Sequence, residues 1–277
     1  MSDAPLPVTR IEPPRGWNPL ALGELVEYRE LAAFFVWRDI KVRYKQTALG
    51  VTWALLQPIA TMVVFSVVFG RLAHVPSDGV PYPLFALAGL LPWQLFSSAL
   101  TASAGSLVSS AGLLTKVYFP RLVVPLAAVM ATFVDFLVSL AVLAGLMAYY
   151  HAAPGAAVVT LPLFLALALT TALGVGLWFA ALNVRYRDVQ YVMPFLVQVW
   201  LFASPVAYSA SMIPSARWRA IYGLNPMAGA IQGFRWALVG GPAPGAIVWP
   251  SVAVAVALLV SGVVFFKRFE DSFADVV

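Results

Sequence analysis

Long stretches without charged side chains are the feature of this chain that most restricts its fold. Residues 122–184 contain one charged residue, Asp135, in 63 positions. Of the 29 charged residues, 13 lie in residues 1–45, 5 in residues 267–277 and only 11 in the 221 residues between. Soluble domains carry about 25% charged residues, whereas this chain has 10% and a mean hydropathy of +0.87. The middle of the chain therefore belongs in lipid, which excludes a soluble enzyme, a disordered tail and, despite a pI near 9.6, a nucleic-acid binder.

Six segments are long and apolar enough to cross a membrane as helices. A crossing needs roughly 20 apolar residues, because the hydrocarbon layer is about 30 Å thick and a helix rises about 1.5 Å per residue. His151, Pro154 and Gly155 mark the turn between the third and fourth segments. We predict an all-α integral membrane domain over 46–277 with six transmembrane helices, at about 51–70, 84–103, 123–148, 158–182, 190–209 and 246–266.

The basic residues predict how these helices are oriented. If the N-terminus is cytoplasmic, 13 of the 17 Lys and Arg residues fall on the cytoplasmic side, and only Arg71, Arg217, Arg219 and Arg235 fall outside. Basic residues near the ends of spans are retained in the cytoplasm. Charged residues at 24–30 interrupt the first apolar run, so we expect no signal peptide. The expected topology has both termini in the cytoplasm.

Residues 20–45 follow a Pro-rich tail at 1–19, to which we assign no role, and they combine an apolar patch with a basic run. The patch, which ends at Trp37, suits the acyl boundary of a bilayer, and the basic run suits anionic head groups. We therefore predict an amphipathic interface segment. Its last five residues alternate with period 2, so the prediction does not require that the segment form one straight helix. An ordinary basic flank to the first span is the alternative. The interface residues are Trp37, Arg38, Lys41, Arg43 and Lys45.

Residues 105–121 form a connector between the second and third spans. Serines at its start and Pro120 at its end favour a short cytoplasmic helix from about Ser106 to Tyr118. A helix in this place could transmit a push from a soluble partner to the membrane bundle. The alternative is a connector with no further role.

Residues 205–245 are rich in Pro and Gly and lie on the outer side. They contain two pieces, at about 214–223 and 226–239, that are too short to cross the membrane. Broken segments of this kind are re-entrant or interfacial, and they survive at membrane depth only when buried in protein or lining a wet cavity. We predict a mouth at 213–240; the alternative is a loop that lies on the head groups.

Asp135 lies inside the third span with no ionisable partner along its own helix. A carboxylate at the bilayer centre costs roughly 2.5 to 3.5 kcal/mol on insertion scales, so it should face the bundle interior, be protonated or accept hydrogen bonds. Structural hydrogen bonding is favoured over transport, because one acid without a second charged residue in the membrane is weak support for a pump. An ion-coupled carrier or channel that uses Asp135 stays open.

Motifs for catalysis and nucleotide binding are missing. The chain has no cysteine, no HExxH motif, no closely spaced pair of acids on a membrane face, and no GxxxxGK[ST] phosphate loop. We therefore expect no enzyme activity, no catalytic residue, and no metal or cofactor bound by this chain. A membrane-embedded lipid or sugar enzyme is disfavoured, and energy for transport would come from another subunit or an ion gradient.

Five separated segments resemble one family of transporters. In chain order they are WRDIKVRYKQTALGVTWALLQP (37–58), GLLPWQLFSSAL (89–100), KVYFPR (116–121), NVRYRDV (183–189) and LNPM (224–227). Together they are similar to the membrane permease of polysaccharide and polyol-phosphate ABC exporters, over about residues 20–270. The resemblance implies export of a lipid-linked polysaccharide, O antigen first, across the bacterial inner membrane. Teichoic acid and capsular polysaccharide are the alternative substrates.

The resemblance also implies partners and residue roles. The permease would act as a homodimer that contacts membrane lipids. It would assemble with two ATP-binding subunits, which would hold ATP and Mg²⁺. No nucleic-acid partner is expected. Its facing first and fifth spans would enclose a channel, and the interface segment would help to dock the ATPase. The connector would be a coupling helix, with Leu113, Leu114, Lys116, Tyr118, Phe119 and Arg121 near the partner. The gate and substrate path would include Tyr208, Trp218, Tyr222, Asn225, Phe234 and Trp236.

Overall fold

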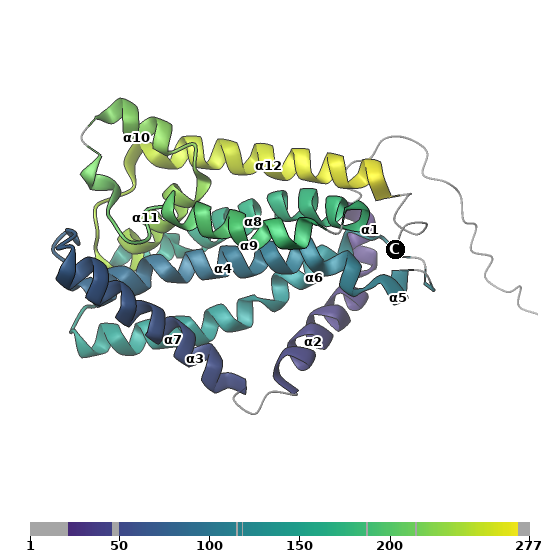
Figure 1. The fold of residues 1–277 in the computed structure, drawn as a ribbon, viewed down its shortest axis with the longest axis horizontal. Helices are drawn as coiled ribbons and strands as arrows, with labels where there is room; N and C mark the ends of the chain where they lie inside the picture. The colour runs from purple at the N-terminus through teal and green to yellow at the C-terminus, as the bar shows by residue number, and fades with distance from the viewer. Residues whose placement is uncertain are drawn as a thin grey trace, which may run out of the picture.

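A computed structural model describes residues 22–45, 50–114, 116–117, 119–186, 188–213 and 215–270. Within these ranges all regular structure is helical, so the predicted all-α fold is confirmed (Figure 1). The predicted tail at 1–19 and the coupling residue Tyr118 lie outside the described residues. The α-helices are α1 (Leu22–Glu27), α2 (Arg29–Lys45), α3 (Gly50–Phe65), α4 (Tyr82–Ser109), α5 (Ala111–Leu114), α6 (Val123–Ala131), α7 (Phe133–Tyr149), α8 (Leu161–Arg185), α9 (Val189–Phe202), α10 (Ala216–Tyr222), α11 (Pro226–Val239) and α12 (Val248–Phe269). A π-helical segment, η1 (Ser66–Leu72), and three 3₁₀ turns, η2 (Ala156–Thr160), η3 (Ala210–Met212) and η4 (Gly245–Ile247), complete them.

Five helical segments among the described residues are long and apolar enough to cross a membrane, where six spans are predicted. They are Thr52–Leu72, Tyr82–Ser109, Val123–Tyr149, Ala156–Arg185 and Gly245–Phe269. The predicted fifth span at 190–209 corresponds to α9, which has only 14 residues. α9 is short because Pro205 has no N–H to continue the helix, and the Pro205 and Val206 carbonyls accept hydrogen bonds from Arg235 instead.

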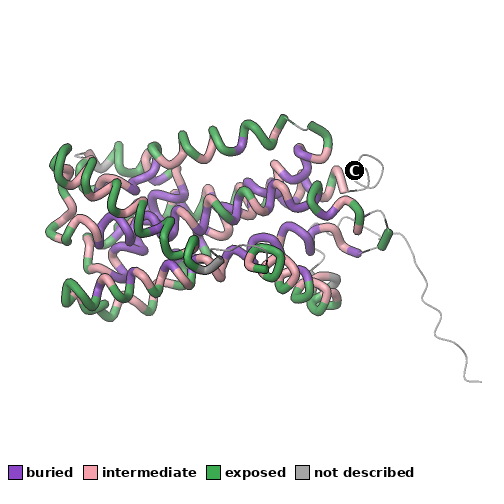
Figure 2. The backbone as a smooth tube through the Cα atoms, turned by 60° about the horizontal axis from the view of Figure 1, so that its bottom comes forward, coloured by how far each residue is buried: buried purple, intermediate pink, exposed green. Residues whose placement is uncertain are grey.

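The centre of the bundle is α4. It packs against α8, α6, α11 and α7, and α8 in turn packs against α12. Leu87, Phe96 and Leu100 of α4 are fully buried. Figure 2 shows buried residues along the middle of the bundle and exposed residues along its outer helices. Any site at the surface of this chain is therefore built around a fixed central helix.

The connector after α4 differs from the prediction of a separate helix from about Ser106 to Tyr118. α4 continues without a break to Ser109, and α5 has only four residues. The serines do not cap a new helix, because their hydroxyls donate to carbonyls one turn back: Ser106 to the Ser103 oxygen at 2.7 Å and Ser109 to the Ser106 oxygen at 2.9 Å. Such bonds satisfy the hydroxyl of a serine that lies inside a helix.

Helices α8 and α12 approach each other through glycines. A methyl group on Gly262 would lie 2.2 Å from the carbonyl oxygen of Gly174, and one on Gly174 would lie 2.6 Å from the backbone nitrogen of Leu259. Small residues allow helix backbones to come this close in membranes. By contrast, Gly145 on α7 has open space where its side chain would be.

Gly262→Ala should destabilise the protein, whereas Gly145→Ala should not. The added methyl at Gly262 forces α8 and α12 apart, and overpacking of this kind costs about 1 to 3 kcal/mol. At Gly145 the same change improves helix propensity and meets no neighbour. The measurement is the melting temperature of the detergent-purified protein by fluorescence-detected size exclusion. Equal losses at both positions would show that the glycine contact does not set the α8–α12 spacing.

Candidate functional site

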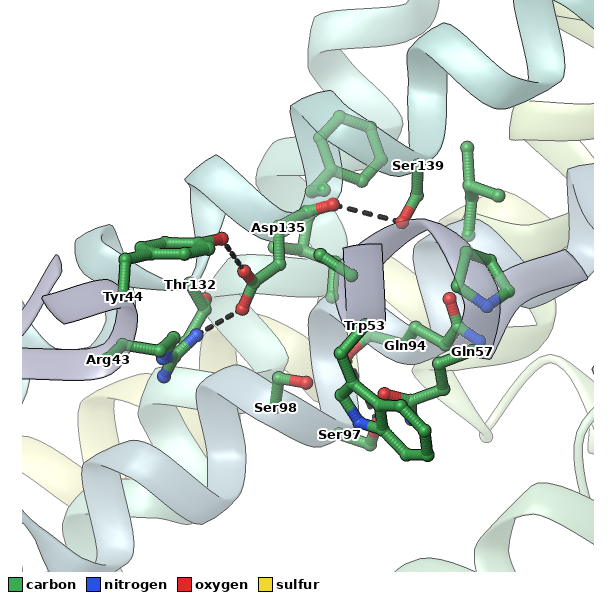
Figure 3. Close-up of a pocket in the computed structure, with 15 residues that line it drawn as sticks. Arg43, Tyr44, Trp53, Gln57, Gln94, Ser97, Ser98, Thr132, Asp135 and Ser139 are labelled. Carbon is green, nitrogen blue, oxygen red and sulfur yellow. Dashed lines mark hydrogen bonds and ion pairs between the residues drawn. The ribbon is translucent and has the colours of Figure 1, made fainter. Parts of the chain in front are cut away.

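A cavity of about 540 Å³ lies between the end of α2 and helices α3, α4 and α7 (Figure 3). We call it the interface cavity, because α2 is the helix predicted at the membrane interface. It joins residues from four parts of the chain that are far apart in sequence. Its walls are mixed in character, with Leu91, Leu95, Phe136, Pro58 and Ala54 beside Arg43, Tyr44, Trp53, Gln57, Gln94, Ser97, Ser98, Thr132, Asp135 and Ser139.

Asp135 at the start of α7 is paired with the end of α2. Its carboxylate forms an ion pair with the Arg43 guanidinium and accepts a hydrogen bond from the Tyr44 hydroxyl (Figure 3). The Arg43 and Asp135 side chains are 39% and 32% exposed, so solvent screens part of their attraction. Burial, together with the bond to Asp135, raises the pKa of Tyr44 to about 12, so its hydroxyl keeps its proton at neutral pH. The lone acid of the third span is therefore a link between the interface helix and the bundle.

Sequence reasoning did not find this link, because the partners of Asp135 lie 91 and 92 residues earlier in the chain. It also missed the polar wall of the cavity on α3 and α4, notably Gln57 and Gln94. A usable signal was present, since both glutamines interrupt segments predicted to cross the membrane. Polar side chains inside spans are expensive to bury and tend to face the bundle interior or a water-filled cavity.

The five predicted interface residues divide into two groups on α2. Arg38 and Arg43 point to protein partners: the Arg38 guanidinium donates to Asp39 at 2.9 Å and to the Ser110 hydroxyl at 3.4 Å. The other three are exposed, with the Lys41 ammonium 4.3 Å from the centre of the Trp37 ring and Lys45 at the end of the helix. Phe35, which is fully buried, holds the helix to the connector by packing on Phe119 at 5.5 Å between ring centres.

The predicted coupling residues also divide between core and surface. Leu114 and Phe119 are buried in the cluster that packs α2 against α6, whereas Lys116 and the adjacent Val117 are exposed. Leu113 is half-buried beside that cluster. The backbone N–H of Arg121 donates to the Glu270 carboxylate at 3.1 Å, which ties the connector to the end of α12. Among the described residues of the connector, the exposed ones are Val108, Ser109, Gly112, Lys116 and Val117, and the last two form an exposed patch at 116–117 after α5.

Arg235 organises the opposite end of the bundle, although the charge pattern assigned it to an outer loop. Its guanidinium is buried and donates to the carbonyls of Phe85 at 3.1 Å, Pro205 at 2.5 Å and Tyr208 at 3.2 Å, and also to that of Val206. It lies over the Phe85 ring, 3.6 Å from the ring centre. One side chain therefore satisfies the backbone carbonyls of the turn that ends α9. It also attaches this turn to α4 and α11.

The predicted gate residues lie around α10 and α11, which occupy the two places where short helices are predicted. Asn225 caps α11 by accepting from the Met227 N–H at 3.1 Å, and it also accepts from the Trp200 indole at 2.9 Å. Tyr208 and Tyr222 share a hydrogen bond of 2.8 Å, and burial with this bond raises the pKa of Tyr222 well above its ordinary value. Phe234 is fully buried against the bundle, Trp236 is half-buried beside Phe164, and Trp218 is exposed.

The arrangement suits binding and mechanical coupling. In the described parts of the chain, no group of three or more His, Asp or Glu side chains is placed to hold a metal ion. What the geometry provides is a membrane-embedded bundle with a polar cavity at one helix junction and short broken helices at the far end. That combination is typical of a transport subunit.

The chain belongs to the ABC-2 type transporter family, which it matches over residues 31–239. It is a multi-pass membrane subunit, and the family implies a partner subunit that binds ATP. The chain is 32% identical to the O-antigen export system permease protein RfbA of Myxococcus xanthus, over 91% of this chain and 97% of the relative. It is 28% identical to RfbA of Klebsiella pneumoniae over 87% and 92% of the two chains, and 29% identical to the polysialic acid transport protein KpsM of Escherichia coli over 74% and 79%. The predicted family is thereby confirmed.

A double-mutant cycle on Arg43→Gln and Asp135→Asn should show that the two residues interact. Hydrogen bonds to charged groups contribute about 1.5 to 3 kcal/mol, and partial exposure reduces this to about 1 kcal/mol for each single variant. Removing both partners should cost less than the sum, with a coupling of at least about 0.5 kcal/mol. The measurement is reversible unfolding in mixed micelles. Asp135→Asn combined with Arg71→Gln, an exposed arginine far from the cavity, serves as the additive control; additivity in both pairs would contradict the link.

Proposed function

We propose that this chain is the permease of an exporter that moves a lipid-linked polysaccharide, O antigen first, across the bacterial inner membrane. Two copies would assemble with two ATP-binding subunits, which would hold ATP and Mg²⁺. The observation that carries the proposal is similarity to O-antigen export permeases over 87% to 91% of the chain. A match of this extent covers the interface segment, the connector and the short outer helices together.

The two ends of the bundle suit this function differently. α1, α5 and the C-terminal end of α12 lie at one end, and α10 and α11 lie at the other (Figure 1). We place the first end in the cytoplasm, with both termini, and the second at the outer exit. Closure of the ATP-binding subunits would then press on the exposed patch at 116–117 and on α2. Coupling requires that the partner interact differently with the two states of the permease.

The homodimer is supported by the faces that α3 and α9 leave uncovered. Val64 on α3, and Tyr191, Phe195 and Phe202 on α9, are each more than half exposed. A second copy seated on these faces would enclose a path between the first and fifth spans. Lipid would cover the remaining outer faces.

A capsular polysaccharide is the second candidate substrate, because the chain also resembles KpsM over 74% of its length. Teichoic acid is a further alternative within the same class of exporters. An ion-coupled carrier is less well supported, since the Asp135 carboxylate is already held by Arg43 and Tyr44 within the chain.

Val117→Asp with Lys116→Glu should uncouple ATP hydrolysis from export. The changes reverse the charge of the exposed patch and would weaken contact with the partner, so surface glycan should fall by at least about tenfold, within the usual range of coupling between sites. Val159→Asp, on the 81% exposed η2 turn at the other end, is the matched control and should export normally. The measurement is surface polysaccharide in cells that make the lipid-linked glycan and carry the permease with its ATP-binding partner.

Insertion of each variant is checked by the amount of folded permease in the membrane fraction. Unreduced export by the double variant would remove the coupling role of the connector. Export by the permease when the partner carries an inactive ATP site would overturn the proposed function itself.

A further inference from the structure

The interface cavity contains hydrogen-bonding groups that the protein does not use. Among the described residues, the Gln57 and Gln94 amides and the Ser98 hydroxyl make no hydrogen bond. Gln57 and Ser98 are exposed, Gln94 is half-buried, and all three line the cavity. Other polar groups there are occupied locally: the Ser139 hydroxyl donates to the Asp135 carbonyl at 2.9 Å and the Ser97 hydroxyl to the Gln94 carbonyl at 3.1 Å. The unused groups come from α3 and α4 and face the same space (Figure 3).

Their position within the spans gives this observation weight. Gln57 and Gln94 lie inside Thr52–Leu72 and Tyr82–Ser109, two of the segments that cross the membrane. An amide that faces hydrocarbon without a partner costs roughly 2 to 7 kcal/mol, depending on the reference state. These side chains should therefore contact water or a polar ligand in the cavity.

The charge of the cavity selects among polar ligands. Arg43 and Asp135 neutralise each other at one end, and the remaining polar lining consists of amides and hydroxyls. A site for a phosphate or another anion would need an unpaired cation, which this lining lacks. Amide and hydroxyl groups both donate and accept hydrogen bonds, as the hydroxyls of a sugar do.

Size and shape agree with this chemistry. The volume of about 540 Å³ lies within the range of about 300 to 1,000 Å³ that holds small organic ligands. Trp53 is 56% exposed at the wall, so its indole offers a flat apolar surface of the kind on which the C–H face of a sugar ring packs. Leu91 and Leu95 supply the apolar remainder.

We propose that the interface cavity is a binding subsite for neutral sugar units of the transported glycan. Gln57, Gln94 and Ser98 would hydrogen-bond the sugar hydroxyls, and Trp53 would pack against the ring. The subsite lies within one permease copy, between its first three spans, and so is distinct from a channel between two copies. The proposal rests on the proposed export function.

The test uses the absence of cysteine from this chain. The single variant Ser98→Cys reports on the cavity, Ser97→Cys is a second reporter if the first is poorly inserted, and Val159→Cys reports on an exposed turn outside the cavity. N-ethylmaleimide modification is timed in cells that make lipid-linked O polysaccharide and in cells that do not. Both carry the ATP-binding partner with an inactive ATP site, so that the glycan stays on the inner side.

We expect the cavity cysteine to react at least threefold more slowly when the glycan is present, with no change at the control position. Adding Gln57→Leu and Gln94→Leu should abolish this protection, and adding Gln190→Leu, an exposed glutamine on α9, should preserve it. Equal rates with and without glycan would overturn the proposal. If those equal rates rise when Gln57→Leu and Gln94→Leu are added, the cavity holds a different ligand, such as a phospholipid head group.

A separate measurement distinguishes failure of this proposal from failure of the proposed function. Surface polysaccharide is measured with an active partner and the unmodified permease in the same strain. Export without protection of the cavity cysteine would contradict the subsite proposal alone. Failure of the unmodified permease and its partner to export the glycan would contradict the proposed function, on which the subsite proposal rests.

Discussion

The absence of water in the hydrocarbon layer is the constraint on which this structure depends. Backbone polar groups in lipid must be satisfied within the chain, which is why the described residues form helices and why their breaks carry side-chain partners. Arg235 shows the principle most clearly, because it donates to three carbonyls of the turn that follows α9 and to the Phe85 carbonyl on α4. Asp135 follows the same rule with Arg43 and Tyr44. These two side chains thus report contacts that the fold requires.

This constraint also explains what could be predicted from the sequence. Hydropathy is a local property, so the long helices and the two short pieces that became α10 and α11 were accessible without a structure. The partners of Asp135 and Arg235 come from distant helices, and no pattern along one helix encodes them. The connector was mispredicted because serine favours helix caps and also tolerates a helix interior, and only packing decides between the two. The short length of α9 also depends on a distant contact, because Arg235 of α11 holds the turn that follows α9.

Helix α2 connects the features that sequence reasoning treated separately. Its buried Phe35 packs on Phe119 of the connector, and its last turn reaches Asp135 on α7. A displacement of α2 would therefore act at once on the connector, on α7 and on the shape of the interface cavity. This makes the cavity sensitive to the same element that the family resemblance assigns to docking of the ATP-binding partner. Binding and coupling would then share one helix and need no long pathway through the bundle.

The two ends of the bundle differ in how firmly they are held, and this difference gives the motion a direction. The Arg235 cluster is buried, and opening it would leave a cation and several carbonyls without partners in a dry interior, which is costly. The Arg43–Asp135 pair is about one-third exposed, so water can replace its bonds at lower cost. Regions with solvent-accessible bonds open at lower free energy than buried ones. A mechanical input should therefore first separate α2 from α7 at the interface cavity, while α9, α11 and α4 move as one body at the opposite end.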